Sequence, residues 1–128
     1  MDIKMDQGEL DELVKAFHLM WESFPEPVQL AHKSKEVVAV NSACQSIGRV
    51  VGMNCAKHGA PEGHRGCLAN KAVSARQTAW KKSKYGEREI FCYWLPVPGH
   101  PDFFIHFAVG SAINYNERPE MDPTSMEQ

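Results

Sequence analysis

The sequence lacks the features of a membrane-spanning or secreted protein. None of its apolar runs approaches the roughly 20 residues that a transmembrane helix needs. The first ten residues are acidic and polar, without the basic and then apolar grading of a signal peptide. We therefore expect no membrane association and a cytoplasmic location. Cysteines there are mostly reduced thiols or metal ligands rather than structural disulfides.

The sequence also lacks a strong charge of either sign, because its formal net charge is −2. Lys and Arg residues do not cluster with Trp80, Tyr93 and Trp94, so we expect no nucleic-acid partner. No oxyanion-hole signature accompanies Cys67 as a candidate nucleophile, and we expect the protein not to be an enzyme.

The composition is that of one globular domain, with 43% hydrophobic and 23% charged residues in 128. We expect this domain to span residues 1–115. Residues 116–128 are rich in proline and acidic side chains, and we expect them to form a disordered tail.

An amphipathic helix is predicted over residues 8–22. Asp6 is placed to cap it, and Leu10, Leu13 and Phe17 follow at helical spacing before Pro25 stops it. The apolar surface is broader than one stripe, so the helix either packs on its own domain or forms a homodimer contact.

Five strands and further helices are predicted after this first helix. The strands cover residues 28–32, 36–41, 78–82, 88–95 and 103–109. A short helix over 43–47 and a longer one from about residue 67 lie between the second and third strands. Residues 96–101 contain three prolines and are expected to connect two strands. This order predicts an α+β fold with a five-stranded antiparallel sheet and helices on one face.

The order and spacing of these elements resemble a PAS domain. The residues that carry the resemblance are Phe24-Pro25-Glu26-Pro27-Val28, which lead into the first strand, and Val38-Ala39-Val40-Asn41-Ser42-Ala43, where the second strand enters its helix. Gly52-Met53-Asn54-Cys55, followed twelve residues later by Cys67, resembles a cysteine-containing subgroup. The likeness covers residues 13–115.

The resemblance implies a sensor or interaction module that holds a small ligand or cofactor between sheet and helices, or that dimerises. The chain has no room for a kinase, a cyclase or a DNA-binding domain. We therefore expect it to signal to a separate protein or through a homodimer formed by the N-terminal helix.

A cluster of metal-binding residue types lies between the two halves of the chain. Cys55 and His58 form a Cys-x2-His pair, and His64 and Cys67 form a His-x2-Cys pair five residues later. Thiolates and imidazoles in two pairs are the ligands of a tetrahedral zinc site. The spacer is shorter than that of a zinc finger, so an uncoordinated polar loop remains an alternative.

Two other functions for the cluster stay open. Cys55 and Cys67 could form a reversible disulfide, because Arg65 and a helix N-terminus beside Cys67 would stabilise its thiolate. His64 could ligate haem, although it precedes the long helix that carries the haem ligand in some PAS domains. His106 is a separate candidate for binding a ligand or metal if Phe104, His106 and Ala108 face inward.

Overall fold

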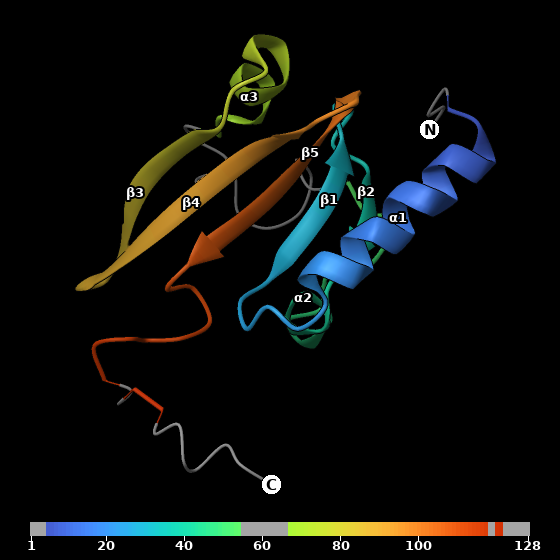
Figure 1. Cartoon of the computed structure of the whole chain (residues 1–128). Coiled ribbons are helices and arrows are strands. Elements are labelled where there is room, and N and C mark those ends of the chain that lie inside the picture. The colour runs from blue at the N-terminus through green and yellow to red at the C-terminus, as the bar shows by residue number, and fades with distance from the viewer. Residues whose placement is uncertain (1–4, 55–66, 118–119, 122–128) are drawn as a thin grey trace, which may run out of the picture.

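The computed structural model describes residues 5–54, 67–117 and 120–121. Its centre is an antiparallel sheet with the strand order β2-β1-β5-β4-β3 (Figure 1). The strands are β1 (Val28–His32), β2 (Val37–Val40), β3 (Ala79–Tyr85), β4 (Arg88–Val97) and β5 (His100–Val109). The helices are α1 (Gln7–Trp21), α2 (Ser42–Ser46) and α3 (Ala69–Ala75). The predicted α+β architecture is confirmed.

Helix α1 forms where the sequence predicts it. The Asp6 carboxylate accepts a hydrogen bond from the Glu9 backbone N–H at 3.3 Å and thereby caps the first turn. Leu13 and Phe17 point into the core and are buried against residues of β1, β2 and β5. Burying this stripe stabilises a helix that has little intrinsic stability by itself.

Strand register divides the sheet into two faces, because directly paired residues point to the same side. Leu30 pairs with Ile105, and Val28 pairs with Phe107, on the face that α1 covers; we call it the outer face. Gln29 pairs with His106 on the opposite face, which we call the inner face. His106 therefore has the inward orientation on which its prediction as a ligand-binding or metal-binding residue depends.

Helices α2 and α3 cover parts of the inner face. Cys44 of α2 packs with Val37 and Val40, whereas Ala69 and Ala72 of α3 pack in a second cluster. That cluster also contains Ala31, Trp94 and Phe104. Figure 1 shows α1 on the other side, over β1 and β2, and no described helix over β3 and β4 on that side.

One local prediction was wrong: strand structure continues through the prolines. Strand β4 includes Pro96, and β5 includes Pro101, with only a short turn around Gly99 between them. Strand β3 begins at Ala79, opposite Trp94, so β4 has one neighbouring strand at Pro96. A proline is tolerated there because no strand on the open side needs a hydrogen bond from the backbone N–H that proline lacks.

None of the described helices is long and apolar enough to cross a membrane. The predicted tail at 116–128 lies largely outside the described residues.

Candidate functional site

Polar side chains interrupt an otherwise apolar inner face. Gln29 on β1 lies opposite His106 on β5, and His106 lies opposite Trp94 on β4. Arg49, in the segment that follows α2, reaches the same row through a hydrogen bond to Gln29. We call Gln29, Arg49 and His106 the inner polar cluster.

The imidazole of His106 has a defined orientation. Its Nδ1 lies 2.9 Å from the backbone oxygen of Tyr93, and its ring stacks on Trp94 with centroids 4.7 Å apart and an interplanar angle of 13°. A carbonyl oxygen can only accept, so Nδ1 carries the proton and Nε2 holds the lone pair of the neutral ring. Nε2 can therefore accept a hydrogen bond or ligate a metal.

The pKa of His106 is lowered to about 4, mainly because burial disfavours the charged imidazolium. The Tyr93 carbonyl opposes this shift by stabilising the protonated ring, and the positive charge of Arg49 adds to it. His106 is consequently neutral at pH 7. At constant pH its charge can change only if the surroundings change, for example by arrival of an anion.

Gln29 is the most unusual member of the cluster. Its side-chain Oε1 accepts a hydrogen bond from Arg49 Nη1 at 2.9 Å. Within the described part of the chain, its Nε2 is buried and has no hydrogen-bond partner, and the residue is only 2% exposed. Because an arginine can only donate, the Arg49 contact also settles which amide atom is oxygen. A buried amide without a partner costs about 1–3 kcal/mol, so native proteins rarely keep one.

The backbone that follows α2 positions Arg49. Gly48 has φ of +88°, a conformation that glycine adopts readily, and the Arg49 backbone N–H donates to the Cys44 oxygen at 3.3 Å. The chain thus turns sharply at the end of the helix and directs Arg49 back toward β1.

The described segments that contain Arg49 and α3 bring no acidic residue that could neutralise Arg49. Neither of the segments 42–54 and 67–85 has an Asp or Glu. Arg49 takes part in none of the ion pairs found among the described residues. The cluster therefore combines one positive charge, one neutral histidine and one unpartnered amide donor.

Three described cysteines lie on or near the inner face. Burial raises the pKa of the Cys44 thiol, and the positive charge of Arg49 partly offsets that rise. Burial also raises the pKa of Cys92, and the nearby thiol of Cys67 contributes to the rise. Cys67 itself is exposed and precedes α3 by two residues. Cys67 and Cys92 are therefore electrostatic neighbours, a pairing that the spacing of the cysteines did not suggest.

The predicted Cys/His site can be placed only in part. Cys55, His58 and His64 lie outside the described residues, so neither the zinc nor the haem proposal is tested. Among the residues that the structure describes, no three His, Cys, Asp or Glu side chains are grouped as a metal site requires.

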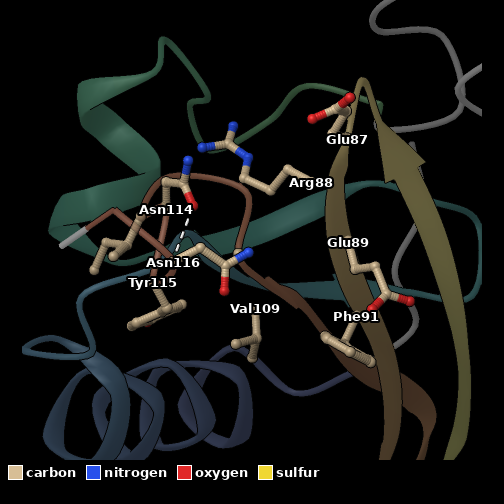
Figure 2. A pocket seen from close by; sticks show the side chains of 10 residues that line it. Glu87, Arg88, Glu89, Phe91, Val109, Asn114, Tyr115 and Asn116 are labelled. Carbon is tan, nitrogen blue, oxygen red and sulfur yellow. Dashed lines mark hydrogen bonds between the residues drawn. The ribbon is translucent and has the colours of Figure 1, made fainter.

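Three surface pockets formed by described residues lie away from the inner polar cluster. One, of about 180 Å³, lies where the ends of β4 and β5 meet the segment after β5, and Figure 2 shows Arg88, Phe91 and Tyr115 among its lining residues. Its volume is below the roughly 300 Å³ at which ligand pockets usually begin. Others reach about 340 Å³ near Pro96 and about 260 Å³ near His32. The inner polar cluster is therefore singled out by its buried polar groups.

Sequence patterns indicate His106 as a candidate site residue but do not indicate Gln29 or Arg49. A signal for Gln29 was present, because it is the polar residue between Val28 and Leu30 in a strand that is buried throughout. Arg49 had no such signal, since its position against Gln29 depends on the turn after α2.

Comparisons with known proteins find similarity at the level of structure. No family model matches the chain, and no curated protein matches it. The PAS domain from Bordetella pertussis BvgS superimposes with a TM-score of 0.60 at 17% identity, over 77% of this chain and 85% of that one.

Two further structures show the same similarity. A domain of an HTR-like protein from Haloarcula marismortui gives a TM-score of 0.54 at 18% identity, over 66% of this chain and 95% of that one. The photoactive yellow protein domain from the sensor histidine kinase Ppr of Rhodospirillum centenum gives 0.53 at 16%, over 80% and 98%. The sheet order, the helices α2 and α3 on its inner face and these superpositions together show that this chain has the fold of a PAS domain.

Proposed function

We propose that this protein is a sensory module that binds a small ligand at the inner polar cluster and passes the resulting change to a partner protein or through a homodimer. The observation that carries the proposal is the buried, unpartnered Nε2 of Gln29 beside Arg49 and His106. Buried polar groups are normally satisfied, so an orphaned donor in an apolar face is where a ligand would gain most.

The structural neighbours support a sensory function. One similar structure is that of a sensory box sensor histidine kinase from Vibrio cholerae, and another is a domain of the sensor histidine kinase Ppr. Those proteins are distant in sequence, at 8% and 16% identity, so they support the class of function and leave the ligand open.

Ligand binding is tested by a thermal-shift screen of small metabolites against the wild type and two glutamine variants. Gln29→Leu removes the amide from the inner face, whereas Gln77→Leu makes the same change at an exposed position. We expect compounds that stabilise the wild type and Gln77→Leu but not Gln29→Leu. A screen in which every stabilising compound acts equally on all three proteins would contradict the proposal.

A thiol sensor is the alternative, favoured by Cys67 lying near enough to Cys92 to help raise the pKa of the Cys92 thiol. The oxidant would join the two sulfur atoms as a disulfide, taking up two electrons and two protons from the thiols. Exposed Cys67 would react first and half-buried Cys92 would resolve the adduct.

This alternative is tested with diamide as the oxidant, followed by peptide mapping of the disulfide. Variants Cys55→Ser, Cys67→Ser and Cys92→Ser distinguish a Cys67–Cys92 bond from a Cys55–Cys67 bond. Elemental analysis of protein purified without oxygen tests the zinc alternative in the same samples. Absence of both disulfide and metal would leave the cysteines without a sensory role.

Signal transmission through a homodimer is supported by the exposed surface of α1. Leu19 and Met20 are 82% and 75% exposed. Two exposed acids lie on the same side of the helix, because Glu12 precedes Leu19 by seven residues and Glu9 precedes Met20 by eleven, and both spacings are close to whole turns.

The outer face of β3 complements that surface, with Trp80 55% exposed and Lys82 and Lys84 at alternating positions beside it. We propose that α1 of one copy packs on β3 of a second copy, with acids against lysines.

A further inference from the structure

We propose that the ligand of the inner polar cluster is a small monocarboxylate, held by Arg49 and the Gln29 amide. This inference rests on the proposed function, because it names the class of ligand for the same site. It commits the site to an anion, whereas a sensory module could equally bind a neutral molecule.

Unused hydrogen-bond donors point to an anion. Gln29 Nε2 offers N–H groups that no described residue accepts, and Arg49 uses Nη1 for the Gln29 oxygen. A guanidinium has five N–H donors, and its planar fork matches the two oxygens of a carboxylate. A carboxylate between Arg49 and Gln29 would accept from both and would satisfy the orphaned amide.

The charge balance favours an ion with a single negative charge. Arg49 is the cation of the cluster, and the described elements α2, α3 and β3 bring no Asp or Glu toward it. Lys81 lies on the inner face of β3 but one register row away, opposite Cys92. One carboxylate neutralises one arginine, whereas a dianion would bring an uncompensated charge into a largely apolar face.

His106 supplies a reporter for the bound anion. Its Nδ1 proton is committed to the Tyr93 oxygen, so Nε2 is the atom that can gain a proton. The charged and titratable groups of the described elements around it are Arg49, Lys81 and the thiols of Cys44 and Cys92. A carboxylate that offsets Arg49 would make protonation of His106 easier, so binding should raise the pKa of His106.

The experiment uses the full chain, labelled with ¹⁵N, and follows the Gln29 side-chain amide and the His106 ring nitrogens by NMR. Acetate and butyrate are titrated at constant ionic strength, with acetamide and butyramide as neutral isosteres and inorganic phosphate as a dianion. We expect saturable shifts of both residues with the acids, little effect of the amides, and a higher pKa of His106 in the acid-bound protein.

Two arginine variants separate recognition from general electrostatics. Arg49→Gln should weaken carboxylate binding at least about tenfold, because a hydrogen bond to a charged group contributes about 1.5–3 kcal/mol. Arg88→Gln removes an arginine from the pocket shown in Figure 2 and should leave binding unchanged. If circular dichroism shows that Arg49→Gln does not fold, Gln29→Met provides the same test by removing the other proposed donor to the carboxylate.

The possible results separate failure of this inference from failure of the proposed function. Binding of the amides with equal affinity, or binding that survives Arg49→Gln, would overturn the carboxylate and keep the ligand site. No shift of Gln29 or His106 with any of these probes would overturn the carboxylate, and a metabolite screen without hits would remove the site as well.

Discussion

Asn41 shows how much one buried side chain can organise. Its Oδ1 accepts from the Val28 and Cys44 backbone N–H groups, both at 3.0 Å. Its Nδ2 donates to the carbonyl oxygens of Trp21, Phe24 and Glu26 at 3.0–3.3 Å. One amide therefore links the end of α1, the start of β1 and the cap of α2. This network explains why an asparagine follows β2 in the segment that resembles a PAS domain.

We predict that Asn41→Asp lowers the free energy of unfolding by at least about 3 kcal/mol. The substitution replaces the donor Nδ2 by an oxygen that faces three carbonyl oxygens, and it leaves a buried carboxyl group without donors on that side. Urea denaturation measures the change. Asn116→Asp, at an exposed position, should stay within about 0.5 kcal/mol of the wild type. Equal stability of the two variants would show that the network contributes little.

His106 makes stability depend on pH in a defined direction. Its folded-state pKa is about 4, below the ordinary value of 6.5, so the unfolded chain binds a proton first as the pH falls. The contribution is complete above pH 6.5 and is lost between pH 6.5 and 4. It amounts to about 3 kcal/mol.

We predict that His106→Phe flattens the dependence of unfolding free energy on pH in that window. The difference between wild type and variant, from urea denaturation between about pH 7.5 and about pH 4.5, isolates His106 from His32, whose pKa is also lowered by burial. Parallel curves for the two proteins would mean that His106 titrates normally in the folded state.

At the scale of elements, Glu26 ties the segment after β5 to the start of β1. Its buried carboxylate accepts from the backbone N–H groups of Gly110 at 2.5 Å and Ala112 at 2.7 Å, and from the Ser111 hydroxyl at 3.3 Å. Gly110 has φ of +96°, and a Cβ there would lie 2.9 Å from the Glu89 oxygen. The turn after β5 thus requires both a glycine and a buried acid.

We predict that Glu26→Gln destabilises the protein by about 2 kcal/mol and loosens this segment, because the new amide nitrogen would face a backbone N–H in place of an acceptor. Hydrogen exchange should show faster exchange at Gly110 and Ala112 in the variant, while amides in the β4–β5 ladder change only with global stability. Unchanged exchange at these two amides would contradict this prediction.

At the scale of the whole molecule, the described helices cover only half of the outer face. Helix α1 lies over β1 and β2 (Figure 1). Beyond it, a row of stacked aromatic rings continues from Phe107 through Tyr93 to exposed Trp80. A row that continues past its covering helix is a reasonable place for a second copy to pack.

We predict that the wild type forms a dimer in analytical ultracentrifugation at protein concentrations up to roughly 100 μM. The double variant Leu19→Asp, Met20→Asp should be monomeric and should have the same circular dichroism spectrum as the wild type. Charges at these exposed positions cost little in the folded monomer but would oppose burial against Trp80. Ile47→Asp, at an exposed position on α2's side of the sheet, is the matched control. A wild type that stays monomeric throughout this range would rule out the dimer.

The sequence by itself determined the elements and their order. Alternation in β5, the cap at Asp6 and the apolar stripe of α1 are local patterns, and local patterns reflect backbone geometry within a few residues. The strand through Pro96 was missed because its tolerance depends on where β3 begins, 17 residues away along the chain.

Only the tertiary structure decided which residues form the site. The inner polar cluster brings together β1, the turn after α2 and β5, which are 20 to 77 residues apart in the chain. Strand register determines that Gln29 and His106 share a face, since a slip of β5 by one residue against β1 would turn His106 to the other face. Local patterns place polar residues in elements, but contacts between distant segments create the orphaned amide and the uncompensated charge that give this face its chemistry.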